Sequence, residues 1–247
     1  GETVREIDPA GVVLASGKLQ ADWIIAADGG TSRVRRQLGL DGPARHARIG
    51  IRRHYAIQPW TDTVQVHIGA GVEACVTPVG SETVCIAAMI DDNHTSFDQA
   101  LARLPTLRQR LEVAPPASET RGAASVFTRA LRVVSGNVAL IGDAAASVDA
   151  IAGLGVTMGL RQALVVARSL KDGSLESYER AFPGLIRTAH AMTSFMLLLK
   201  RRRWLKRIVL HSMASRPWIA NQLLRLHGGE ALPPVNGQPE AFPVEIR

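Results

Sequence analysis

Two segments of the chain join an acidic residue to glycines at the end of an apolar run. The first is Ala26-Ala27-Asp28-Gly29-Gly30-Thr31-Ser32-Arg33-Val34-Arg35. Gly29 removes side-chain bulk where a phosphate-bearing ligand would approach the backbone, and Arg35 would supply positive charge. A purely structural interpretation is equally supported, in which Asp28 caps a helix that follows a strand and a turn.

The second segment runs from Ala139 to Gly159. An apolar run ends there in Gly142-Asp143, and open α/β sheets bind ligands at the carboxyl ends of their strands. The Asp143 carboxylate would accept hydrogen bonds from ligand hydroxyls. Ten residues later, Gly153-Leu154-Gly155 opens a helix whose free N–H groups and dipole suit an electron-rich or anionic group.

The spacing of Gly153, Gly155 and Gly159 imitates a dinucleotide-binding fingerprint. That fingerprint requires its first glycine in the tight turn directly after a strand. In this sequence the first glycine lies well beyond the strand end, so we reject this interpretation.

The elements that would position these segments follow from hydrophobic periodicity and from glycine and proline. Short strands between glycine turns predict an antiparallel sheet in the middle of the chain, whereas the two acidic segments follow buried strands. The pattern predicts a small hairpin at 12–14 and 17–19, strands at 22–27, 64–68, 73–77, 83–89 and 137–141, and helices at 33–38, 96–111 (interrupted at Pro105) and 156–170. Two or three further helices are predicted over 175–226, broken near Pro183 and at Pro217.

The composition is that of a folded protein with an uneven charge. The 247 residues are 46% hydrophobic and 21% charged, with a formal net charge of +7. Ten Lys and Arg and no acid lie between Arg180 and His227, so 19 basic residues oppose 22 acidic ones elsewhere. The aromatic share of 4% leaves few residues to stack on single-stranded nucleic acid, and no nucleic-acid motif is present, so that partner is disfavoured.

The basic region includes residues 192–210, where apolar residues and Trp204 alternate with clustered cations. Such a pattern fits an interfacial helix on an anionic membrane surface. It fits equally well a helical pair that packs on the body and leaves its cations in solvent. The apolar stretch at 195–199 is too short to span a bilayer.

Cys75 and Cys85 give neither a disulfide framework nor a metal-ligand cluster, so no metal site is predicted. A hairpin turn near Gly80 would place them opposite each other, which permits a cross-strand disulfide. Free thiols in a reducing compartment are favoured. The polar start of the chain lacks the apolar core of a signal peptide, so we expect a cytoplasmic protein, with a peripheral position at the inner face of the membrane as the alternative.

The two acidic segments, in this order and with an antiparallel region between them, resemble FAD-dependent monooxygenases of the aromatic-hydroxylase type. The closer resemblance is to the geranylgeranyl-reductase-like branch. It rests on Asp149-Ala150…Gly153-x-Gly155, on Leu160-Arg161-Gln162-Ala163, and on the strand sequences around 52–60 and 76–80. The resemblance covers nearly the whole chain.

This resemblance implies an α/β (α+β) fold. It consists of a partial FAD-binding Rossmann-like three-layer domain (1–47 and 132–175), an inserted antiparallel β-sheet substrate domain (48–131), a C-terminal basic helical segment (176–229) and a tail (230–247). The implied cofactor is FAD, bound by Asp28, Gly29, Arg35, Gly142, Asp143, Gly153, Leu154 and Gly155, with NAD(P)H as electron donor. No catalytic residue is assigned.

The implied activity is that of an oxidoreductase, either a monooxygenase or a reductase, acting on a hydrophobic small molecule such as a polyketide, a phenolic compound or an isoprenoid lipid. The family opens with a strand–Gly-x-Gly-x-x-Gly–helix unit that holds the FAD pyrophosphate, and nothing before Asp22 resembles it. A second hypothesis follows, in which the chain is a truncated non-catalytic remnant or a membrane-associated interaction module that no longer binds FAD tightly.

Overall fold

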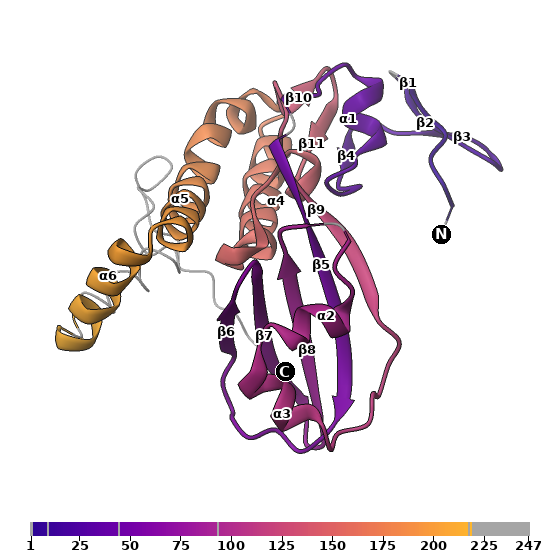
Figure 1. The fold of residues 1–247 in the computed structure, drawn as a ribbon. Helices are drawn as coiled ribbons and strands as arrows, with labels where there is room; N and C mark the ends of the chain where they lie inside the picture. The colour runs from indigo at the N-terminus through magenta and orange to yellow at the C-terminus, as the bar shows by residue number, and fades with distance from the viewer. Residues whose placement is uncertain (1, 9, 44, 93, 217, 219–247) are drawn as a thin grey trace.

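A computed structural model describes residues 2–8, 10–43, 45–92, 94–216 and 218 (Figure 1). The predicted tail at 230–247, the last part of the basic segment at 219–229 and the predicted helix break at Pro217 lie outside the described residues. The fold is a mixed α/β arrangement in which one small sheet and the long helices adjoin a larger antiparallel sheet, and a second small sheet at the N-terminal end stands apart from it.

The first 40 residues form a small antiparallel sheet and the loop that carries the first acidic segment. Strands β1 (Glu6–Asp8), β2 (Gly11–Leu14) and β3 (Gly17–Gln20) pair in that order, which confirms the predicted hairpin. Strand β4 (Ile24–Ala26) follows, and helix α1 (Arg33–Gln37) ends before Gly39, whose φ of 64° suits glycine.

The largest sheet has six strands in the order β12-β9-β5-β8-β7-β6. It is formed by β5 (Arg45–Ala56), β6 (Gln65–Gly69), β7 (Val72–Gly80), β8 (Thr83–Ile90), β9 (Arg121–Arg129) and the short β12 (Ala146–Ser147). Helices α2 (Phe97–Ala102) and α3 (Pro105–Leu111) lie against one face of it. Ser96 and Gln99 form a capping box at the start of α2, and Pro105 begins α3, as the interruption in the sequence predicts.

The second acidic segment completes a small three-stranded sheet. Strand β10 (Val134–Ser135) pairs with β11 (Val138–Leu140), and β11 runs parallel to β4 with Val138 opposite Ile24. Two 3-10 turns, η1 (Gly142–Ala144) and η2 (Ala150–Ala152), lead into α4 (Gly155–Lys171). The parallel pair places the ends of β4 and β11, and therefore both acidic segments, at one edge of the sheet.

Helices α5 (Glu176–Arg201) and α6 (Arg203–Ser215) follow α4 and extend away from the small sheet (Figure 1). The predicted break near Pro183 is wrong, because Pro183 lies inside α5. Proline removes one helical hydrogen bond, but Phe182 and Ile186 are buried in the core beside it and hold the helix in place. Among the described residues, no helix is both long and apolar enough to cross a membrane.

Two details of the large sheet differ from the sequence-based expectation. Strand β9 was not predicted, because its first residues are small or polar and lack a clear apolar alternation. Cys75 and Cys85 do not face each other either: Cys75 lies opposite Ala87, and Thr77 lies opposite Cys85. The turn lies at Ser81 and Glu82, beyond Gly80, which sets this register, and both cysteines are free thiols.

A buried ionic cluster centred on Arg48 joins the large sheet to the rest of the molecule. Arg48 on β5 donates to Glu73 on β7 and to Asp149 ahead of η2, at 3.0 Å each, and its Nε lies 3.0 Å from Asp91. Lys200 on α5 lies 3.1 Å from Glu73 and 2.7 Å from Asp91. Burial opposes the charged form, but the carboxylates of Glu73 and Asp149 raise the pKa of Arg48.

Replacing Arg48 with alanine should therefore destabilise the protein strongly. The substitution leaves the buried Asp149 carboxylate without its cation and Glu73 with Lys200 alone, and breaking a buried pair costs about 3–5 kcal/mol of the free energy of unfolding. Lys18→Ala, which breaks only the exposed Lys18–Asp8 pair, is the matched control and should leave the urea midpoint unchanged. Equal midpoints for the two variants would contradict this assignment.

Candidate functional site

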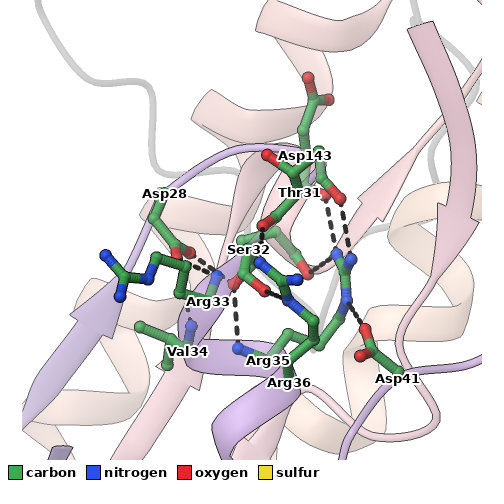
Figure 2. A network of polar contacts seen from close by, with 11 residues as sticks. Asp28, Thr31, Ser32, Arg33, Val34, Arg35, Arg36, Asp41 and Asp143 are labelled. Atoms are coloured by element: carbon green, nitrogen blue, oxygen red, sulfur yellow. Dashed lines mark hydrogen bonds and ion pairs between the residues drawn. The ribbon is translucent and has the colours of Figure 1, made fainter. Parts of the chain in front are cut away.

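The first acidic segment is held by contacts within the chain. The Asp28 carboxylate accepts hydrogen bonds from the Ser32 hydroxyl at 2.5 Å and from the backbone N–H groups of Arg33 at 2.7 Å and Val34 at 3.2 Å (Figure 2). Ser32 is the N-cap residue of α1 and accepts from the Arg35 N–H. Burial opposes ionisation, but these hydrogen bonds hold the pKa of Asp28 below its usual value. Asp28 therefore makes the capping contacts of the structural interpretation.

Arg35 connects the two acidic segments. Its side chain is buried, and its guanidinium donates to the carbonyls of Gly30 at 2.8 Å and Ala144 at 2.9 Å and pairs with Asp41 at 2.7 Å (Figure 2). The contact with Ala144 joins α1 to η1 across 109 positions of the chain. Each guanidinium nitrogen already has a partner, so the geometry gives Arg35 a positioning role, and its contact with FAD stays a prediction.

The second acidic segment turns sharply at Gly142. This residue has φ 60°, a conformation that favours glycine, and its N–H donates to the buried Gln162 side chain of α4 at 2.6 Å. A Cβ at Gly159 would lie 3.4 Å from the Gly142 Cα, so the first turns of α4 pack closely against this loop. In the sequence, Gln162 stands out only as part of the family resemblance. Its contact with Gly142 arises from tertiary packing, which the spacing of residues in the chain does not predict.

The Asp143 carboxylate differs from that of Asp28, because no hydrogen-bond donor contacts it among the residues that the structure describes. Burial alone raises the pKa of Asp143. Beside it, the 17-residue helix α4 begins at Gly155. Its N-cap residue, Leu154, has no side chain that can accept a hydrogen bond, so no N-cap side chain contacts the first N–H groups of the helix. An acceptor and several donors thus lie together at one loop.

Glycines shape the start of α4. Gly153 adopts φ 63° and ends η2, and a Cβ placed there would meet no atom within 4 Å. A Cβ at Gly155 would lie 3.9 Å from Asp143 Oδ1, so Gly155 faces the carboxylate. The structure therefore brings Gly142, Asp143, Gly153 and Gly155 into one cradle, with Leu154 between the two glycines. Gly29 lies on the neighbouring loop, and Arg35 of α1 contacts this segment through the Ala144 carbonyl.

Comparison with known proteins decides the family. A family model described as "FAD binding domain" matches residues 14–192, which is most of the chain. The chain belongs to the FAD-binding domain family. No curated protein matches it significantly.

Solved structures show where the FAD-binding fold recurs. The flavin-dependent brominase Bmp2 superposes with a TM-score of 0.74 at 18% identity, over 94% of this chain and 65% of that one. The Diels-Alderase PyrE3 superposes with a TM-score of 0.73 at 21% identity, over 92% of this chain and 54% of that one. A flavoprotein/dehydrogenase from Cytophaga hutchinsonii superposes with a TM-score of 0.66 at 18% identity, over 78% of this chain and 55% of that one. The chain thus spans between half and two thirds of these proteins' lengths.

The residues of the cradle fit a flavin cofactor in their donor and acceptor types. The Asp143 carboxylate suits the hydroxyl groups of the flavin's sugar-alcohol chain, and the uncapped start of α4 offers N–H donors to an electron-rich ring. The lack of a side chain at Gly155 leaves room beside the carboxylate. Arg35 supports this loop through its hydrogen bond to the Ala144 carbonyl.

Gly155→Ala tests whether the cradle holds FAD. Alanine is favoured over glycine inside a helix by about 1 kcal/mol, so the thermal midpoint should stay level or rise. The added methyl group lies beside the Asp143 carboxylate, and we expect FAD affinity to fall at least tenfold, measured by quenching of flavin fluorescence.

Gly30→Ala is the matched control for that experiment. A Cβ at Gly30 meets no atom within 4 Å, and its φ lies outside the positive region. FAD affinity should therefore stay within twofold of the unsubstituted chain. An unchanged affinity in Gly155→Ala, or an equal loss in both variants, would show that the cradle does not face the cofactor.

Proposed function

We propose that this chain is the flavin-facing and substrate-facing part of an FAD-dependent oxidoreductase, a monooxygenase or reductase that uses NAD(P)H as electron donor. The observation that carries the proposal is the Asp143 carboxylate, which has no donor among the described residues and lies beside the uncapped start of α4. Asp143 is exposed, and an acid with a raised pKa and no protein partner beside free N–H groups is a candidate for a functional site.

FAD, when bound, supplies the redox chemistry of such an enzyme. The chain's own contribution is to bind and orient it. Asp143 accepts hydrogen bonds from hydroxyl groups, and the N–H groups at Gly155 and the following residues favour electron-rich atoms. Arg35 and Gln162 keep the loop in this conformation. No described side chain is assigned as a catalytic acid or base.

The uncovered face of the six-stranded sheet supports a hydrophobic substrate. Cross-strand partners share a face, so Val66, Cys75 and Ala87 form one row, and Ile68, Glu73 and Met89 form the next. Val66 and Ile68 are 59% and 54% exposed. The opposite face is packed under α2 and α3. We propose that a polyketide, a phenolic compound or an isoprenoid lipid lies over the part of this face near Val66 and Ile68, because Glu73 is buried in the Arg48 cluster.

The position of that face relative to the cradle also supports the proposal. Arg48 lies on the same face as Gly50 and Met89, and its hydrogen bond to Asp149 joins the end of this face to the loop that leads into α4. A molecule lying over the sheet would therefore meet the flavin loop at its Arg48 end. The narrower likeness to the geranylgeranyl-reductase-like branch is part of this proposal.

The names of similar structures favour redox chemistry without deciding the reaction. One is a flavin-dependent brominase and another is a probable FAD-dependent monooxygenase from Pseudomonas aeruginosa. The opposing hypothesis, a non-catalytic remnant or interaction module, requires that the folded chain bind FAD weakly or not at all. Purified chain titrated with FAD separates the two, because a bound flavin changes its absorption spectrum and fluorescence.

Asp143→Asn sharpens this test. Because burial raises the pKa of Asp143 from 3.8, its ionised form is disfavoured in the folded state. The stability that the protonated acid contributes is present below pH 3.8 and is lost as the pH rises through the raised pKa. The variant should therefore be at least as stable as the parent at pH 7, with the difference vanishing in acid, while FAD affinity falls at least tenfold. Lower stability at pH 7 with unchanged FAD affinity would refute the role of Asp143.

A second proposed property is peripheral attachment to an anionic membrane through residues 192–210. Leu198, Trp204 and Ile208 are between 46% and 62% exposed, and Arg201, Arg202 and Arg207 are exposed beside them. Part of the segment packs on the body instead: Lys200 pairs with Glu73 and Asp91, and Met192 and Met196 contact the core. The attachment would therefore use the distal end of α5 and α6.

Sedimentation with phosphatidylglycerol vesicles tests this attachment. Each basic residue near an anionic surface contributes about 1 kcal/mol, so replacing Arg201, Arg202 and Arg207 with Gln should reduce binding in low salt at least tenfold. Replacing the exposed Arg33, Arg121 and Arg132 with Gln removes the same charge elsewhere and should matter far less. Failure of the unsubstituted chain to bind vesicles in low salt would end the membrane proposal.

A further inference from the structure

A cavity of about 400 Å³ lies where the end of β9 meets α5. Its lining is mostly apolar and includes Pro43, Phe127, Ala130 and Leu131. Two polar side chains, Arg129 and His190, also line it. Cavities of this size are large enough for a small organic ligand, and a few polar groups in an apolar lining commonly fix such a ligand's orientation.

His190 presents a polar atom that is not satisfied by the protein. Its Nε2 is inaccessible to solvent and has no hydrogen-bond partner among the described residues. The ring stands edge-on to Phe127 at 5.2 Å between centroids, so its orientation is fixed by packing. Burial, and then the nearby charge of Arg129, lower the pKa of His190, which leaves the imidazole neutral at pH 7. A neutral imidazole can offer Nε2–H as a donor.

Arg129 offers a second donor on a rigid support. Its backbone pairs with Ala146 of β12, and the neighbouring Ala130 N–H donates to the Ala145 carbonyl at 2.9 Å. The guanidinium itself makes neither a hydrogen bond nor an ion pair with any residue that the structure describes, and the residue is exposed. An uncommitted cation and an unpartnered imidazole nitrogen therefore line the same apolar cavity.

Unpartnered polar groups gather on these two elements. The buried hydroxyls of Thr128, next to Arg129, and Thr193, one turn after His190, also lack partners among the described residues. Burying a polar group without a hydrogen bond is costly, and such groups are uncommon in folded proteins. Neither threonine lines the cavity, whose polar lining residues are Arg129 and His190.

We propose that this cavity is a binding site for a small aromatic or apolar carboxylic acid. The carboxylate would accept hydrogen bonds from the Arg129 guanidinium, and the ring or chain would lie against the His190 imidazole, Phe127, Leu131 and Pro43. None of these residues belongs to the predicted flavin site, so the proposal does not depend on FAD binding.

The test uses two probes that share a shape and differ in charge, 1-naphthoate and the neutral 1-naphthamide. Calorimetric titration of the full chain should show naphthoate binding at least tenfold tighter than naphthamide. Arg129→Gln should weaken naphthoate at least tenfold and leave naphthamide within twofold. Arg132→Gln is the matched control, since this neighbouring arginine is 66% exposed and does not line the cavity.

The His190 imidazole signals in NMR spectra locate the site independently of stability. They should shift on addition of naphthoate to the unsubstituted chain, with or without saturating FAD. Equal affinity for the two probes, absence of naphthoate binding, or an equal loss in Arg129→Gln and Arg132→Gln would overturn the proposal. So would displacement of naphthoate by FAD, because the cavity would then belong to the cofactor site. A chain that binds naphthoate but fails to bind added FAD would refute the proposed function alone.

Discussion

The arrangement of the candidate site depends on the contacts of one buried guanidinium. Arg35 lies on α1 but reaches the carbonyls of two different loops, Gly30 in the first acidic segment and Ala144 in the second. Backbone carbonyls in a buried turn need donors, and a single arginine can supply several in a fixed planar geometry. Since β4 and β11 are short, this contact, together with their parallel pairing, sets the relative position of the two loops.

The Arg48 cluster does for the large sheet what Arg35 does for the small one. It places three carboxylates and two cations at the junction of β5, β7, the η2 loop and α5. Arg48, Glu73 and Asp149 are nearly inaccessible to solvent, so their charges are held apart from water and depend on one another. The loop that leads to the flavin cradle and the sheet proposed to carry the substrate are thus joined by ionic contacts, which require a defined geometry.

Local signals in the sequence predicted local structure well. The helical pattern at 96–111 and its interruption at Pro105 gave α2 and α3, and buried apolar runs gave β4 and β11. The predictions that failed concern the pairing of the two cysteines and the helix break at Pro183, which local sequence patterns do not determine. The β7–β8 turn lies at Ser81 and Glu82 and not at Gly80, which separates the cysteines, and tertiary packing around Phe182 carried α5 through Pro183.

The candidate site shows the same limit. Spacing singled out Asp143 and the Gly153-Leu154-Gly155 turn, because glycines and a strand-end acid leave a recognisable pattern. Spacing did not separate the roles of Asp28 and Asp143, since both follow an apolar strand and precede glycine-rich sequence. The two differ only in their donors: Ser32 and two N–H groups contact one, and no described group contacts the other. His190 carries no sequence signal, because its significance lies in a nitrogen without a partner.

The parallel pairing of β4 with β11 has a consequence for the order of folding. Ile24 and Val138 are far apart in the chain, and closing so long a loop is entropically unfavourable and slow. The antiparallel strands between them pair through shorter loops, and the register that sets Arg45 opposite Phe127 brings the two ends of the intervening sheet together. Once that sheet has formed, only residues 27–44 and 128–137 still separate β4 from β11. The antiparallel sheet would then act as a template that delivers both halves of the flavin cradle to each other, so that the cofactor loop assembles last.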